Sequence, residues 1–133
     1  VRKSLSFPTD WKEGVVEGFD LEEALRKLLE QLEFQPEKAL EEAEALLRQA
    51  SRRLLQAAAT ATSLERPRLL DLAFNLESVA RSMKAARIRL RAARSDEDVR
   101  LALSDARLDL EESLSYAAQS RDLLARGARR QPL

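Results

Sequence analysis

The segment "LEEAEALLRQASRRLLQAAATA", residues 40–61, decides the fold of this chain. Its apolar and small side chains recur at alternating intervals of three and four residues, the spacing that lines one face of an α-helix. The pattern predicts a helix over about 36–62, with Pro36 in its first turn. The positions on this face are Leu40, Ala43, Leu47, Ala50, Leu54, Ala57 and Ala61.

Two later segments repeat the same spacing and predict helices over about 66–94 and 96–126. Pro67 suits the first turn of one, and Ser95, with an acid three residues later, is a capping signal for the other. Gly127 is placed to end the last helix. The inward positions are Leu69, Leu72, Leu76, Val79, Met83, Ala86, Leu90 and Ala93, and then Val99, Leu103, Ala106, Leu110, Leu114, Ala117 and Leu124.

The two ends of the chain are less regular than its middle. Residues 1–19 predict an irregular arm, which we expect to lie across the bundle because its apolar residues, Trp11 among them, are unfavourable in water. A shorter helix follows over about 21–34. The bundle then covers residues 20–127, and 128–133 form a frayed basic tail.

The composition favours a single helical domain. The chain has 133 residues, of which 44% are apolar and 35% charged, with only 3 Gly and 4 Pro. Leu, Ala, Arg and Glu dominate, and these are strong helix formers. Short connections force neighbouring helices to be antiparallel. We therefore predict an all-α, antiparallel up-down bundle of three long helices plus the shorter N-terminal helix, a four-helix bundle with coiled-coil-like packing.

The residue types that most enzymes need are scarce. The chain has no Cys and no His, which removes thiol chemistry, the commonest metal ligand and the commonest general base. We expect no catalytic, cofactor-binding or metal-binding residues. A distant alternative is a metal-dependent all-α nucleotide hydrolase, with Glu41 and Glu44 facing Asp109 and Glu112. We favour the interpretation that these acids pair with the arginines, since charged runs are usually solvated faces.

An arginine-rich segment, Arg87, Arg89, Arg91 and Arg94, raises the alternative of a nucleic-acid-associated bundle. Against it, the sequence pI is about 6.6 and no aromatic residue lies among the arginines. The acids also gather where folding would place them beside this segment: residues 10–44 hold 12 acids and 4 bases.

Folding the helices as hairpins gives explicit partners for these arginines. Glu37, Glu41, Glu42 and Glu44 fall alongside Lys84, Arg87, Arg89 and Arg91, while Arg48 approaches Glu77, Asp105 approaches Lys84, and Glu22 approaches Arg48. We therefore expect the arginines to pair within the molecule, each exposed pair contributing about 0–1 kcal/mol.

Two helices carry a second apolar stripe opposite their inward face, and a second face implies a second partner. The candidate interface residues are Leu70, Phe74, Arg81, Ile88, Leu101, Leu108, Tyr116 and Leu123. The alternative is that the N-terminal arm and the first helix cover this stripe as additional core. We expect a non-catalytic protein that acts through protein–protein contacts, as an adaptor, structural subunit or regulator, with a homodimer as the simplest assembly.

No apolar run approaches the roughly 18 residues that a membrane-spanning helix needs. We therefore expect no stable membrane insertion and a cytoplasmic location.

Overall fold

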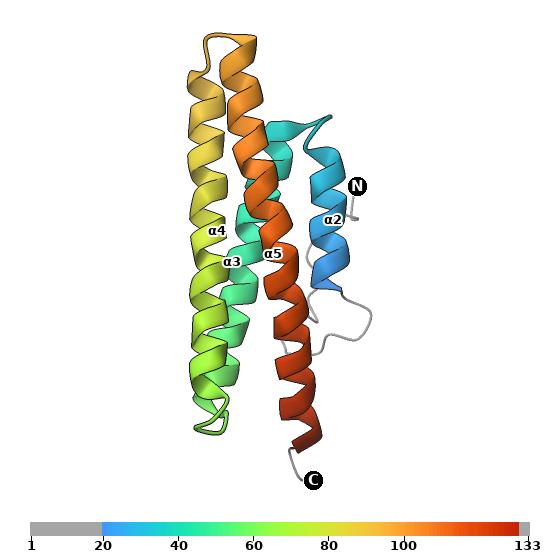
Figure 1. The fold of residues 1–133 in the computed structure, drawn as a ribbon, viewed down its shortest axis with the longest axis vertical. Coiled ribbons are helices and arrows are strands. Elements are labelled where there is room, and N and C mark those ends of the chain that lie inside the picture. The colour runs from blue at the N-terminus through green and yellow to red at the C-terminus, as the bar shows by residue number, and fades with distance from the viewer. Residues whose placement is uncertain (1–19, 131–133) are drawn as a thin grey trace.

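The computed structural model of the chain describes residues 20–130, with side chains as far as 127. Within this range the chain forms four helices and an antiparallel bundle, as predicted (Figure 1). They are α2 (Leu21–Gln31), α3 (Pro36–Ala59), α4 (Arg66–Ala92) and α5 (Asp96–Arg130). The arm predicted over 1–19, with Trp11, and the last residues of the predicted tail lie outside the described residues.

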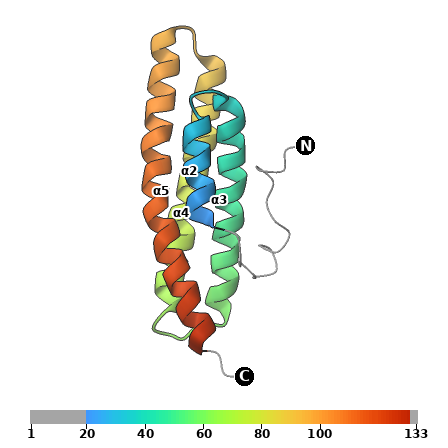
Figure 2. The same cartoon turned by 90° about the vertical axis from the view of Figure 1, so that its right-hand side faces the viewer.

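Each helix runs antiparallel to the one before it. Helix α3 packs along α4, α4 packs along α5, and α2 lies against both α3 and α5 and closes the ring (Figures 1 and 2). With 11 residues, α2 is much shorter than α5, which has 35. Helix α2 therefore covers only part of the α3–α5 side, and the α4–α5 turn extends beyond the α2–α3 turn (Figure 1).

The contact between α3 and α4 is built on small residues. The alanines of α3 that face inward are buried, and Ser51 in the same row donates a hydrogen bond of 2.8 Å to the carbonyl oxygen of Ala73 on α4. Small side chains let two helix backbones approach closely, so larger residues complete the core on either side of this row. The buried residues of α3 are Ala39, Leu40, Ala43, Leu46, Leu47, Ala50, Ser51, Leu54 and Ala58.

Two of the predicted helix starts have the expected caps. Asp20 Oδ1 accepts hydrogen bonds from the backbone N–H groups of Glu22 and Glu23, at 3.0 and 3.3 Å. Ser95 Oγ accepts from the N–H of Asp98 at 3.1 Å, and the Asp98 carboxylate accepts from the N–H of Arg94 at 3.1 Å. These bonds satisfy N–H groups that have no partner inside a helix.

Helices α2 and α3 each end about three residues earlier than predicted. Helix α2 stops at Gln31, and the turn that follows ends at Gln35, where Pro36 disfavours a helical conformation in the residue before it. Helix α3 stops at Ala59. The guanidinium of Arg66 donates hydrogen bonds to the carbonyl oxygen of Ala58 in the last turn of α3, at 3.0 Å, and to that of Ala61 just beyond it, at 2.9 Å.

The prediction that Gly127 ends the last helix is wrong. Helix α5 continues through Gly127 to Arg130, so the first residues of the predicted tail are helical. A glycine interior to a helix lowers its stability relative to alanine but does not by itself stop it. Helix α4 also stops slightly early, at Ala92, since Ala93 is already extended ahead of the cap of α5.

Candidate interaction surface

The outward side of α4 and α5 carries large apolar side chains in contact with solvent. On α4, Phe74 is 66% exposed and Ile88 is 57% exposed, and both lie opposite the buried row that includes Leu76 and Met83. Arg81 lies between them on the same side and is also exposed. The name "outer face" is used below for Leu70, Phe74, Arg81 and Ile88 of α4 together with Leu101 and Leu108 of α5, all exposed.

Two residues predicted for this surface lie elsewhere. Leu123 is only 5% exposed and belongs to the core, so its assignment to the interface is wrong. It sits beside Leu72 and Asn75 of α4, in the seam where α5 leans on its neighbour. Tyr116 is half-buried and packs against the core instead of standing free on the surface.

The hydroxyl group of Tyr116 has a defined partner. It donates a hydrogen bond of 2.7 Å to Oε2 of Glu112, one turn earlier on α5. This bond, partial burial and the negative charge of Glu112 together raise the pKa of the Tyr116 phenol above its ordinary value of 10.0. The contact holds the ring along α5.

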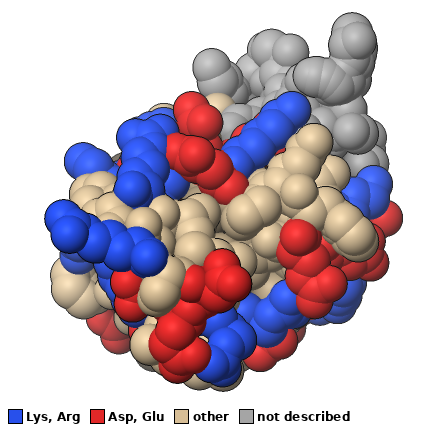
Figure 3. Space-filling view, turned by 90° about the horizontal axis from the view of Figure 1, so that it is seen from above, with Lys and Arg blue, Asp and Glu red and all other residues tan. Residues whose placement is uncertain are grey.

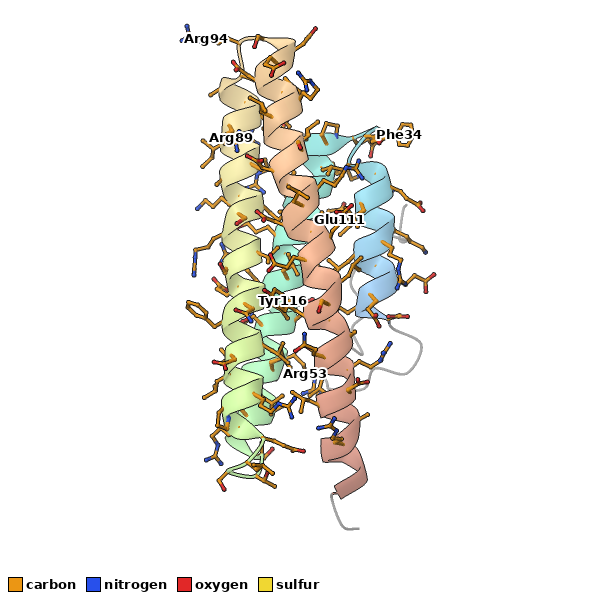
Figure 4. The ribbon with its side chains drawn as sticks, viewed as in Figure 1. Phe34, Arg53, Arg89, Arg94, Glu111 and Tyr116 are labelled. Carbon is orange, nitrogen blue, oxygen red and sulfur yellow. The ribbon has the colours of Figure 1, made fainter. Side chains whose placement is uncertain are left out.

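Three exposed apolar residues were not predicted for any surface. Phe34 and Leu64 are each 80% exposed and occupy the α2–α3 and α3–α4 turns, and Leu55 is exposed on α3. Figure 4 shows Phe34 pointing away from the bundle. The spacing in the sequence does not single out Leu55, because Leu46, which also lies beside the inward row of α3, is fully buried.

A shallow groove runs between α4 and α5 next to the outer face. Small residues, Ala85 and Ala86, form its α4 side, and Leu108 borders it from α5. Arg89 and Asp105 close it with an ion pair of 2.9 Å between Nη1 and Oδ2. The groove is therefore apolar at its base and charged at its end. Its lining residues are Ser82, Ala85, Ala86, Arg89, Asp105, Ala106, Leu108 and Asp109.

The side chains of three of the four arginines between 87 and 94 form ion pairs inside the bundle. Arg87 pairs with Glu44 of α3 at 3.0 Å, Arg91 pairs with Glu37 of α3, and Arg89 pairs with Asp105 of α5. The partners of Arg87 and Arg91 agree with the hairpin alignment. The partner expected for Asp105 was Lys84, but Asp105 pairs with Arg89, which lies five residues further along α4.

Arg94 differs from the other three arginines. It lies at the α4–α5 turn, where its guanidinium points away from the bundle (Figure 4) and has no ion pair with any described residue. Seen from this end, basic and acidic residues alternate over the molecule without forming a uniformly basic surface (Figure 3).

Another pair differs from its prediction. Glu22 of α2 pairs with Arg121 of α5 and not with Arg48, because α2 packs against α5 as well as α3. Arg48 instead bridges Glu44, at 3.1 Å, and Glu77 of α4, as the hairpin alignment indicates for Glu77.

The acidic residues do not gather into a metal site within the described part of the chain. No group of three metal-ligating side chains comes together there. Glu44 is held between Arg48 and Arg87, and the Glu112 carboxylate accepts the Tyr116 hydroxyl.

The sequence matches no model of a protein family, no curated protein and no solved structure. None of the helices among the described residues combines the length and apolar character that crossing a membrane requires.

Proposed function

We propose that this chain is a non-catalytic helical-bundle protein that works through protein–protein contacts made by its outer face, beginning with contact to a second copy of itself. As an adaptor, structural subunit or regulator, it would present a rigid helical surface. The exposure of Phe74 and Ile88 on α4, a helix whose opposite side is already buried, is the observation that carries this proposal.

The physical argument is that large apolar side chains of α4 remain in water, although burying them would be favourable. Fully burying a Phe or Ile side chain contributes about 1.5–3 kcal/mol, and α4 leaves two of them in water on the same side. Arg81 lies between them, and arginine and aromatic residues are the types enriched where interfaces bind most strongly. Contiguous apolar surface rimmed by charge is typical of an interaction site.

The ion pairs of Arg87, Arg89 and Arg91 also support this proposal over phosphate binding. A nucleic-acid backbone would have to displace Glu44, Asp105 and Glu37 from these arginines. That exchange reduces the gain from each phosphate contact.

The test is the molar mass in solution, measured by light scattering after size exclusion over an about 100-fold range of concentration. The chain has a mass of 15.0 kDa, and we expect the wild type to approach twice this value as concentration rises. Ile88→Asp places a charge in the contact and should remain near the mass of one chain at every concentration. Its circular dichroism should match that of the wild type, since Ile88 is exposed.

Leu64→Asp is the matched control. It also replaces an exposed apolar residue by aspartate, but in the α3–α4 turn and away from the outer face. It should assemble like the wild type. A wild type that stays at the mass of one chain throughout, or equal effects of Ile88→Asp and Leu64→Asp, would contradict the proposal.

A further inference from the structure

We propose that the partner on the outer face is a second copy of this chain, whose α4 packs antiparallel to the first α4 about a two-fold axis at the level of Val79. This inference rests on the proposed function and adds the helix that makes the contact, its direction and its register. It is based on a row of residues along the outward side of α4. When a second copy of this row lies beside the first in the opposite direction, the facing side chains are complementary.

The spacing of this row is symmetric. Its members follow one another at intervals of four, three, four, three and four residues, so the row has the same spacing in both directions about position 79. This is the rhythm of a coiled-coil seam. The row consists of Leu70, Phe74, Glu77, Arg81, Lys84 and Ile88, none of which is fully buried.

The charges select the antiparallel direction. In an antiparallel pair centred on position 79, Glu77 faces the partner's Arg81, and the same contact occurs twice by symmetry. In a parallel pair, Glu77, Arg81 and Lys84 would each face their own copy, and like charges placed together disfavour association. Within one chain Arg81 is free to make this contact, because its pair with Glu77 is long, at 3.7 Å, and its side chain is 56% exposed.

The apolar residues fit the same register. Leu70 faces the partner's Ile88 at both ends of the contact, which removes two aliphatic side chains from water at each end. Phe74 falls at the level of the partner's Lys84 and of Ala85 next to it. An ammonium group near an aromatic ring is attracted to its face.

The groove beside the outer face supplies an independent reason for this register. It lies on α4 between Ser82 and Arg89 and is lined by the exposed Ala85, by the buried Ala86 and, from α5, by Leu108. The alignment fixed by Glu77 and Arg81 places Phe74, the most exposed apolar residue on α4, over this groove. A large aromatic ring entering a groove with small residues at its base is the arrangement from which strongly binding interface residues are built.

The register of the α4 pair can be tested directly by disulfide cross-linking. Because the sequence contains no Cys, single-cysteine variants report one position each under mild oxidation. A disulfide forms only where two Cα atoms lie within about 7 Å. We expect Leu70→Cys mixed with Ile88→Cys to give a cross-linked mixed dimer, identified by a tag on one of the two chains. Each variant alone should give little cross-linked product.

Leu55→Cys completes the test. Leu55 is an exposed leucine on α3, away from the outer face, so Leu55→Cys should give little cross-linked product with itself or with either α4 variant. Circular dichroism of each variant checks that the bundle has folded.

The outcomes separate this inference from the proposed function. Efficient cross-linking of Leu70→Cys to itself would show a parallel pair and overturn the register. A dimeric mass in light scattering without cross-linking between positions 70 and 88 would overturn the α4 contact while leaving self-association in place. A mass of one chain at all concentrations would overturn both.

Discussion

The contact of the Tyr116 hydroxyl group can be followed in solution by titrating the phenol, because Tyr116 is the only tyrosine in the sequence. Its pKa is raised first by the hydrogen bond to Glu112 and then by burial and by the Glu112 charge. Glu112→Gln removes the charge and weakens the bond, so the pKa of Tyr116 should fall toward 10.0. Absorbance of the phenolate against pH measures this directly, with Glu111→Gln as a control. An unchanged pKa in Glu112→Gln would contradict the contact.

The same bond has a defined effect on stability. Since folding raises the pKa of Tyr116, its contribution is fully present below the pKa of tyrosine in the unfolded chain. It is lost as the pH rises through the folded value.

At Gly127 we predict a substitution that increases stability. Gly127 lies within α5, and a methyl group added at its Cα would meet nothing within 4 Å. Gly127→Ala should therefore stabilise the end of α5 by up to about 1 kcal/mol, because alanine has less backbone entropy to lose. Circular dichroism during urea unfolding measures the change. Reduced helicity in this variant would mean that α5 ends near Gly127 after all.

At the level of single residues the sequence separates buried from exposed positions well only near the middle of a face. Ile88 lies directly opposite the core of α4 and is exposed as predicted, whereas Leu123 lies at the edge of its face and is buried. Which edge residues are covered depends on how the neighbouring helix leans, and the spacing within one helix does not contain that information.

The α3–α4 contact makes a prediction about element packing. Ala43 is fully buried on α3, while Ala45 on the same helix is exposed. Ala43→Leu should destabilise the bundle by about 1–3 kcal/mol, because a filled core accepts extra methylene groups only with strain. Ala45→Leu makes the same chemical change and should leave stability nearly unaltered. Urea unfolding measures both, and an equal effect of the two changes would mean that α3 is not seated on this row.

The bodies of the helices could be predicted from the sequence, and some of their ends could not. The capping residues Asp20 and Ser95 were predicted correctly, because each lies directly before the helix that it caps. The end of α3 depends on Arg66, whose guanidinium reaches back eight residues to Ala58. Contacts of this length come from the path of the turn, and no local pattern indicates them.

At the scale of the assembly, Arg81 should control association more than stability. Arg81→Glu would face the partner's Glu77 with a like charge and should weaken the dimer by about tenfold or more, equivalent to about 1.4 kcal/mol. Sedimentation equilibrium measures the dissociation constant of the dimer. Raising the salt concentration should reduce the difference in this constant between Arg81→Glu and the wild type. Arg52→Glu on α3 is the control, and equal weakening by it would mean a general effect of charge.

The topology followed from short connections, since neighbours joined by a few residues must run antiparallel. Partners across α3 and α4, such as Glu44 with Arg87, followed from the same alignment. The contact of Glu22 with Arg121 did not, because it joins the first described helix to the last and depends on how the ring closes.

The contact between α2 and α5, which closes the ring, determines the order in which the helices of the bundle would assemble. Helices α3, α4 and α5 meet through short turns, so their contacts close small loops, whereas α2 reaches α5 only after the chain between them is in place. We therefore expect Leu25 and Leu28, buried on α2, to join the core late and to leave it early. In native-state hydrogen exchange, the amides of α2 should open together at a lower free energy than those of α3 and α4, as a separate cooperative unit.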